Sequence, residues 1–157
     1  MKKTQKNSWS ALLAVLIVFL FYNFYQRDSE QYIVVKAIDG DTIELRNGEK
    51  VRYIGIDAPE FDHQQKQVEF FAEESYQANR KMVENRKVKL EYDVQQKDQY
   101  GRWLAYVYTE DGIMINEWLI ANGYAKAIVY PPNVRYTDRF LRLEREAQEK
   151  KIGLWSE

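Results

Sequence analysis

Residues 34–60 read VVKAIDGDTIELRNGEKVRYIGIDAPE, and this stretch carries the signals that decide the fold. Residues 32–38 are rich in β-branched side chains, and residues 42–46 alternate apolar with polar ones, so each predicts a strand. The dipeptide Asn47-Gly48 follows, a pair typical of two-residue β-hairpin turns. Residues 51–56 then predict the returning strand. The folded part of the chain therefore opens with three short strands.

Beyond residue 60 the hydrophobic pattern changes from alternation to helical spacing. Val68, Phe71, Ser75, Ala78 and Met82 recur at steps of three and four, which predicts an amphipathic helix over about 68–85. The remaining predicted elements are strands at 87–94 and 103–109, a short helix with Trp118 and Leu119 inward that ends near Gly123, and a last helix over about 136–151. Five strands and about three helices indicate an α+β domain, whose strands close best as a small barrel.

Length and composition exclude several classes of active site. The chain has 157 residues, enough for one compact domain and a short appendage. It has no cysteine and one histidine, His63, which excludes thiolate metal sites, zinc clusters and serine–histidine triads. The formal net charge is −1, which counts against tight, non-specific binding of nucleic acid through a basic field. Catalysis here has to use carboxylates, arginines, hydroxyls or a hard metal ion.

The N-terminal segment predicts a membrane anchor. Residues 9–25 read WSALLAVLIVFLFYNFY, and no charged residue lies between Lys6 and Arg27. About 20 such residues span a bilayer core as a helix. No small-x-small cleavage site follows, so we expect an uncleaved signal anchor; the alternative is a cleaved signal peptide and a secreted domain. The expected organisation is an anchor at 1–27, a linker at 28–31 and a folded domain at 32–157.

The lysines that precede this segment predict its orientation. Lys2, Lys3 and Lys6 lie on its N-terminal side, whereas Arg27 on the other side is offset by neighbouring acids. The positive-inside rule then places the N-terminus in the cytoplasm and the folded domain outside the cell. We therefore expect a single-pass protein of the cell membrane.

Four carboxylates and one arginine gather in the stretch that opens the domain. Asp39 and Asp41 flank Gly40 at the end of the first predicted strand, and Asp57 and Glu60 follow the third strand, which carries Arg52. Exposed functional groups collect at such strand ends. A cluster of carboxylates without sulfur ligands suits Ca²⁺, and Mg²⁺ less well. Turn aspartates also cap and bend the chain, and for Asp39 alone that reading is the better one.

At this point the chain resembles the thermonuclease (staphylococcal-nuclease-like) family. The resemblance starts in residues 34–60 and continues in order through KMVENRKVKLEYD, DQYGRWLAYVYTEDGIMINEWL, GYAKA and EAQEKKIGLWSE. It covers nearly all of residues 32–157 and leaves only the N-terminal segment outside. Several spaced motifs in the right order make this a specific signal.

The resemblance implies an OB-type barrel with packed helices and a Ca²⁺-dependent nuclease that hydrolyses DNA and RNA to products ending in 3′-phosphate. It also implies a role for each matching residue. The roles are Ca²⁺ binding by Asp41, Asp57 and the backbone carbonyl of Ala58, action of Asp39 on the ion through water, general base or water positioning by Glu60, and phosphate clamping by Arg52 and Arg102. Chemically this set is coherent, because a cation and two guanidinium groups neutralise the charge that builds on a phosphodiester under attack.

Two tyrosines are candidates for binding substrate. Tyr100 precedes Gly101 and Arg102 and can meet a terminal phosphate through its hydroxyl, while Tyr130 lies before the Pro131-Pro132 loop and can stack on a base. The chain has 12 tyrosines, so a core or surface position is an alternative for both. The segment 126–133 is one residue shorter than the family pattern and keeps one of its two tyrosines, which predicts weaker base stacking.

One geometric difficulty and one rival function remain at the level of sequence. Arg52 and Asp57 differ in parity, so a regular strand directs them to opposite faces; a bend or bulge near Gly55 removes the conflict. The rival function is a non-catalytic OB module that binds nucleic acid or protein. A pure binder has no reason to keep the set of carboxylates and arginines. We expect a monomer with no obligate protein partner.

Overall fold

The computed structural model describes residues 12–17, 31–60 and 69–156. The chain divides into two units, residues 1–30 and residues 31–157. In the first unit residues 12–17 form a short helix, and most of the predicted anchor at 9–25 lies outside the described residues. Within those described ranges, no helix is both long and apolar enough to cross a bilayer.

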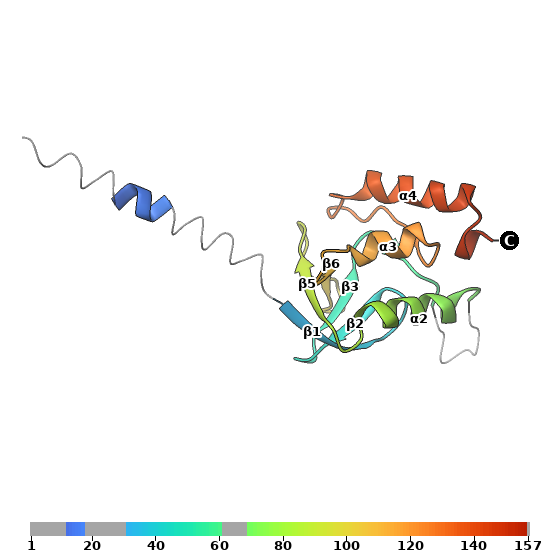
Figure 1. Ribbon diagram of the computed structural model, residues 1–157, viewed down its shortest axis with the longest axis horizontal. Coiled ribbons are helices and arrows are strands. Elements are labelled where there is room, and N and C mark those ends of the chain that lie inside the picture. Colours follow the sequence, from blue (N-terminus) through green and yellow to red (C-terminus); the bar gives the residue numbers. More distant parts are fainter. Residues whose placement is uncertain (1–11, 18–30, 61–68, 157) are drawn as a thin grey trace, which may run out of the picture. The chain divides into compact units, whose positions relative to one another are not determined.

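In the second unit, five of the described strands close into a barrel (Figure 1). Around the barrel the order is β1-β2-β3-β6-β5, and each neighbouring pair is antiparallel except β3 and β6, which are parallel. The strands are β1 (Gln31–Ala37), β2 (Thr42–Leu45), β3 (Lys50–Tyr53), β5 (Lys87–Glu91) and β6 (Trp103–Thr109). The five-stranded barrel predicted from the sequence is thus confirmed.

The hairpin between β2 and β3 forms where Asn47-Gly48 predicts it. Gly48 has φ of +83°, a backbone conformation that glycine adopts without steric cost. The side chain of Asn47 accepts a hydrogen bond from the Glu49 N–H at 3.1 Å and donates one to the Glu49 carboxylate at 2.8 Å. This local bonding sets the register that pairs Thr42 with Arg52.

The predicted strand over 51–56 is wrong in one respect, because it is two strands. β3 ends at Tyr53, and the chain turns at Gly55, where φ is +75°. β4 (Ile56–Asp57) then leaves the barrel and pairs with β7 (Lys126–Ala127) in a separate two-stranded sheet. A Cβ atom at Gly55 would lie 2.9 Å from the ring of Phe140, so glycine also permits close packing of the last helix there.

Three α-helices of the described chain pack on the barrel: α2 (Ala72–Val83), α3 (Ile115–Ala121) and α4 (Thr137–Glu149), followed by a 3-10 turn, η1 (Gly153–Trp155). Figure 1 shows α4 next to α3, with α2 on the opposite side of α3. Helix α2 begins later than the predicted residue 68. Phe71, which precedes its first residue, has φ of +69°, a left-handed conformation that the helix cannot include. Val68 itself lies outside the described residues.

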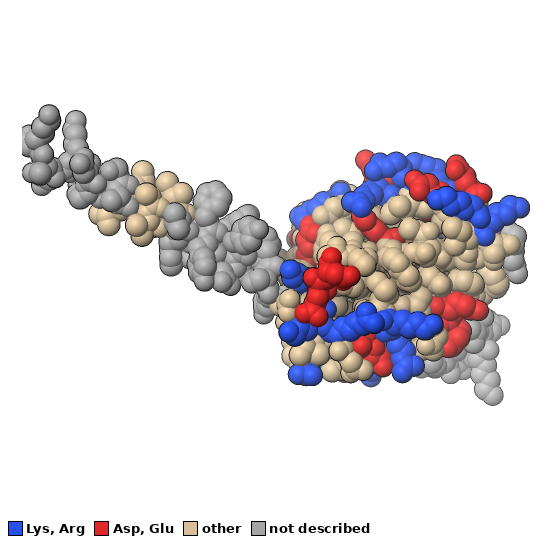
Figure 2. Space-filling model, viewed as in Figure 1, with Lys and Arg blue, Asp and Glu red and all other residues tan. Residues whose placement is uncertain are grey.

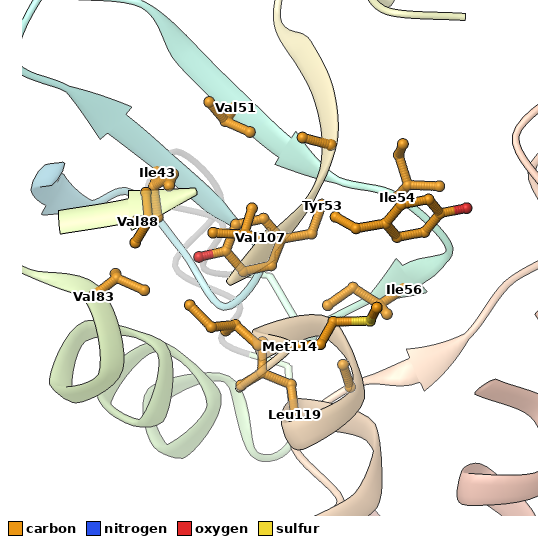
Figure 3. Packing of buried hydrophobic residues seen from close by; sticks show 14 of the residues in the cluster. Ile43, Val51, Tyr53, Ile54, Ile56, Val83, Val88, Val107, Met114 and Leu119 are labelled. Atoms are coloured by element: carbon orange, nitrogen blue, oxygen red, sulfur yellow. The ribbon is translucent and has the colours of Figure 1, made fainter. Parts of the chain in front are cut away.

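The core lies inside the barrel and between it and the helices. Figure 3 shows side chains from β2, β3, β5 and β6 meeting Val83 of α2 and Leu119 of α3. Tyr53, Tyr106 and Phe140 are the largest fully buried side chains. Tyr53 brings a hydroxyl into this interior, so its bonding partner matters for the site described next.

Candidate active site

Arg52 lies between two carboxylates at the end of β3. Its Nη1 is 2.9 Å from Oδ2 of Asp41, and its Nη2 is 3.0 Å from Oδ1 of Asp57. The guanidinium group also donates to the carbonyl oxygen of Ile56 at 2.9 Å. Because the chain turns at Gly55, Asp57 comes round to the face of Arg52 despite its opposite parity, as the predicted bend requires. One side chain therefore joins β2, β3 and β4 at this site.

Asp41 is a buried carboxylate with several donors around it. Its Oδ2 accepts the Ala58 N–H at 2.8 Å, and its Oδ1 accepts the Thr42 hydroxyl at 3.1 Å. Burial raises the pKa of Asp41 to about 7, against the opposing effect of Arg52 and with the support of nearby Asp39. A second positive charge beside Asp41 would relieve this burial of negative charge.

Asp39 and Gly40 set the path of the chain into Asp41. Oδ1 of Asp39 accepts the N–H of Asp41 at 2.9 Å, so Asp39 braces the turn. A Cβ atom on Gly40 would lie 2.5 Å from the Cβ of Ala58. The loop 39–41 is therefore in close contact with Ala58, whose carbonyl is a metal ligand by family resemblance only, and only glycine fits at the centre of the loop.

The oxygen donors at this site suit a hard divalent cation. One guanidinium group contacts both Asp41 and Asp57, which keeps the two carboxylates close together. The described residues contain no group of three or more His, Cys, Asp or Glu side chains arranged to hold a metal. A hard cation held by these two carboxylates would need backbone carbonyls and water as further ligands, which are donors that Ca²⁺ accepts.

Glu60 is exposed and follows Pro59 at the edge of the described chain. Its N–H donates to the Glu69 carboxylate at 3.3 Å, and the Glu69 N–H donates to its carbonyl oxygen at 3.4 Å. These two bonds tie together the ends of the segment 61–68, which lies outside the described residues. Glu60 makes no side-chain hydrogen bond or ion pair with any residue that the structure describes.

Arg102 is held by an aspartate that the sequence reading missed. Its Nε donates to Oδ2 of Asp98 at 2.7 Å, while Oδ1 of Asp98 accepts the N–H groups of Tyr100 at 2.9 Å and of Arg102 at 3.0 Å. Burial opposes the ionised form, yet the hydrogen bonds from Arg102 and Tyr100 outweigh it and lower the pKa of Asp98. Aspartate two residues before a Tyr-Gly turn is the sequence signal that could have identified it.

Both arginines and both candidate tyrosines line one cleft. It has a volume of about 490 Å³, and its walls include Arg52, Arg102, Tyr100 and Tyr130. The two arginines line the same cleft because β3 pairs with β6 in parallel. Arg52 lies opposite Leu104, which is two residues after Arg102. Tyr100 is 75% exposed, and its ring centroid is 5.6 Å from the Arg102 guanidinium carbon. Guanidinium groups can bind a phosphate, and tyrosine rings in the same cleft can stack on the neighbouring bases.

The loop that carries Tyr130 is bonded to Gln95, which lines the same cleft. Asn133 is buried and forms a two-point clasp with the backbone of Gln95, whose N–H donates at 2.7 Å and whose carbonyl accepts at 2.8 Å. Farther along, Arg135 pairs with Glu91, which also accepts the hydroxyl of Tyr136. The sequence reading missed these contacts, because their partners lie about forty residues apart.

Charge on the surface is mixed. Figure 2 shows lysine, arginine, aspartate and glutamate side chains next to one another on the visible face, around a broad uncharged area. This agrees with the net charge of −1. On the visible face, positive side chains are therefore interspersed with negative ones and do not form a purely basic surface.

Comparison of the sequence with known proteins finds one nuclease family and several named nucleases. A profile of the family described as Staphylococcal nuclease homologue matches residues 50–157. The thermonuclease of Staphylococcus intermedius is 37% identical over 158 residues, which cover 92% of this chain and 94% of that protein. The thermonuclease of Staphylococcus hyicus is 39% identical over 132 residues, 82% of this chain and 78% of that protein. Endonuclease YncB of Bacillus subtilis (strain 168) is 42% identical over 126 residues, 77% of this chain and 59% of that protein.

Proposed function

The chain belongs to the staphylococcal nuclease homologue family, and from this premise we propose that it is a nuclease that hydrolyses phosphodiester bonds of DNA and RNA in a Ca²⁺-dependent reaction. The similar proteins are named thermonucleases and endonucleases, which supports a phosphodiesterase. The observation that carries the proposal is the meeting of Arg52 and Arg102 in one cleft while Arg52 contacts the carboxylates of Asp41 and Asp57.

The proposed cation site uses Asp41, Asp57 and the carbonyl oxygen of Ala58, with Asp39 acting through water. Ca²⁺ bound there supplies positive charge where negative charge grows on the phosphate during attack. The surroundings of Asp41 support this assignment. Its carboxylate is buried next to the negative charge of Asp39 and is paired with Arg52, so a bound cation would offset the remaining negative charge. The affinity expected of such an incomplete carboxylate set is low, with Kd of about 10⁻⁴–10⁻³ M.

Arg52 and Arg102 act as the phosphate clamp in this proposal. A planar guanidinium group meets two phosphate oxygens at once, so two of them can hold the scissile phosphate in a fixed orientation. Arg102 is pre-oriented by Asp98 at 2.7 Å, which reduces the ordering cost when substrate binds. Arg52 already bridges two carboxylates, so the phosphate enters next to a group whose position is fixed.

Glu60 is the proposed general base or water positioner. Glu60 is exposed and follows Ala58 by two residues, and a positioned base contributes about 10²–10⁴-fold to rate. Water attacks the phosphorus, and the bond to the 5′ oxygen breaks, which leaves the phosphate on the 3′ end. No 2′-hydroxyl takes part, so both DNA and RNA are substrates. Tyr100 contacts a terminal phosphate, and Tyr130 stacks on a base.

We further propose that residues 9–25 anchor the protein in the cell membrane and that the nuclease domain lies outside the cell. The apolar run and the three preceding lysines support this orientation. A low-affinity Ca²⁺ site is suited to an extracellular location, where sites with Kd of about 10⁻⁴–10⁻³ M are typical. The alternative is secretion after signal cleavage. Protease treatment of intact cells tests the orientation, because it reaches an anchored domain outside the cell but not a cytoplasmic one.

The full chain tests the proposal directly. Plasmid DNA and RNA are each incubated with added Ca²⁺ and with a chelator, and the ends of the products are identified. We expect Ca²⁺-dependent cleavage of both, and an about 10²–10⁴-fold slower reaction in Glu60→Gln with unchanged circular dichroism. Binding of nucleic acid without cleavage at any Ca²⁺ concentration would instead support the non-catalytic OB module. Unchanged activity of Glu60→Gln would remove Glu60 from the mechanism.

A further inference from the structure

Asn79 is a fully buried amide on α2, with 0% of its surface exposed. Its Nδ2 donates to the backbone carbonyl of Asp39 at 2.8 Å, and its Oδ1 accepts the hydroxyl of Tyr53 at 2.8 Å. A polar group inside the core is stabilising only when it is bonded in this way. Here the amide joins three elements: helix α2, the loop 39–41 and the end of β3.

Both partners of Asn79 border the proposed cation site. Asp39 braces the N–H of Asp41, and the N–H of Tyr53 donates to the carbonyl oxygen of Asp41 at 2.9 Å. Ser75, one helical turn before Asn79, lies 3.1 Å from the position of a Cβ on Gly40. Helix α2 therefore backs the loop twice, once by packing and once by a hydrogen bond.

We propose that Asn79 is a positioning residue for the cation site: by bonding the Asp39 carbonyl from α2, it fixes the loop that presents Asp41 toward Asp57. This inference rests on the proposed function. Without the amide donor, the partly buried Asp39 carbonyl loses its hydrogen bond to α2, and the loop is free to shift toward water to replace it. That movement carries Asp41 away from Ala58 and Asp57.

The two hydrogen bonds of Asn79 have different consequences, which allows a sharp test. Asn79→Ala removes both, whereas Tyr53→Phe removes only the hydroxyl and leaves the donor to Asp39 in place. Thr109→Val is a control, because it removes buried hydroxyl bonds to Ile113 in a turn that carries none of the proposed site residues. Should Asn79→Ala not fold, Asn79→Ser carries the same prediction, since its hydroxyl is too short to replace the amide.

Two readouts are measured on the full chain. The first is the unfolding temperature as a function of Ca²⁺ concentration, which gives a Ca²⁺ affinity without substrate. The second is the Ca²⁺ concentration for half-maximal cleavage of single-stranded DNA, with KM for DNA at saturating Ca²⁺. We expect Asn79→Ala to weaken Ca²⁺ binding about tenfold in both, the equivalent of one buried hydrogen bond, with KM within about twofold of wild type.

Tyr53→Phe and Thr109→Val are expected to lower the unfolding temperature while Ca²⁺ affinity stays within about twofold of wild type. If Asn79→Ala loses stability but keeps wild-type Ca²⁺ affinity, or if Thr109→Val weakens Ca²⁺ binding as much, Asn79 has a merely structural role and the inference is overturned. If the wild-type chain itself shows neither Ca²⁺-dependent stabilisation nor Ca²⁺-dependent cleavage, it is the proposed function that fails, and the inference falls with it.

Discussion

Replacing Gly40 with alanine tests whether the loop 39–41 and Ala58 have to stay in contact for catalysis. The new Cβ would lie 2.5 Å from the Cβ of Ala58 and 3.1 Å from the Cβ of Ser75. Carbon atoms in ordinary contact are about 3.5–4.0 Å apart, so the loop and Ala58 have to separate by about 1 Å. Gly40 is absent from the residues with positive φ, so the cost is steric and not conformational.

This separation has two expected consequences of known size. Overpacking lowers the free energy of unfolding by about 1–3 kcal/mol. A displacement of about 1 Å between groups that hold the reacting centre costs about 100-fold in rate. Because Asp41 follows Gly40 directly, we expect the Gly40→Ala rate of DNA hydrolysis at saturating Ca²⁺ to fall about 100-fold.

Two further variants separate the effect on the site from the effect on stability. Gly48→Ala introduces a side chain at φ of +83° with no atom within 4 Å, and costs about 1–2 kcal/mol of strain in a distant hairpin. We expect it to keep the wild-type rate. Gly40→Ala combined with Ala58→Gly removes the 2.5 Å contact and should recover most of the lost rate, since only the milder contact with Ser75 remains.

Initial rates on single-stranded DNA, with unfolding free energies from urea titration, measure these effects. The reasoning is refuted if Gly40→Ala retains the wild-type rate, or if the double variant with Ala58→Gly is no faster than Gly40→Ala alone.

Four more predictions follow from the same site. Asp98→Asn weakens the charged hydrogen bond to Arg102, so in urea titration at pH 7 the free energy of unfolding should fall by about 1–3 kcal/mol, and the rate should fall with it; equal rates would mean that Arg102 needs no partner. Burial raises the pKa of Asp41 to about 7, so below that pH Ca²⁺ has to displace a proton from the carboxylate. The Ca²⁺ affinity measured by thermal unfolding should therefore rise about tenfold per pH unit between pH 5 and 7 and level off above pH 7. An affinity that does not change with pH would contradict the raised pKa. The metal-free protein should lose stability over the same range as pH rises, because the folded state holds the proton more tightly than the unfolded chain. Tyr130→Ala should raise KM for single-stranded DNA about tenfold at little cost in kcat, as expected for one stacked base, and no change would place Tyr130 outside the substrate path.

Local sequence patterns predicted the elements whose structure is determined locally. The hairpin at Asn47-Gly48 and the strand over 103–109 follow from turn chemistry and β-branched alternation, and both lie where these signals indicate. For residues 51–56 the β-forming Val51, Tyr53, Ile54 and Ile56 predict a single strand, although Gly55 interrupts the run. The glycine itself indicates the bend at residue 55, where φ is +75°, whereas its close contact with Phe140, 85 residues away in the chain, is known only from the packing.

Two residues that support the site differ in how far the sequence indicates them. Asp98 acts on a residue four positions away, so its turn carried a usable signal. Asn79 bonds a carbonyl 40 residues distant and reads in the sequence as one more polar position on an amphipathic helix. Motif resemblance identifies the groups proposed to touch substrate or metal, whereas the residues that hold them are known only from the three-dimensional packing.

The parallel pairing of β3 with β6 has a consequence for when the protein becomes active. Arg52 and Arg102 lie fifty residues apart in the sequence, and the pairing of β3 with β6, with Val51 opposite Trp103, brings their segments together. Contacts of such long sequence separation form late and slowly. In a chain that is still being synthesised, the two guanidinium groups lie on stretches that are not yet paired, so the cleft that holds both has not formed. The proposed nuclease then becomes active only when its barrel has closed.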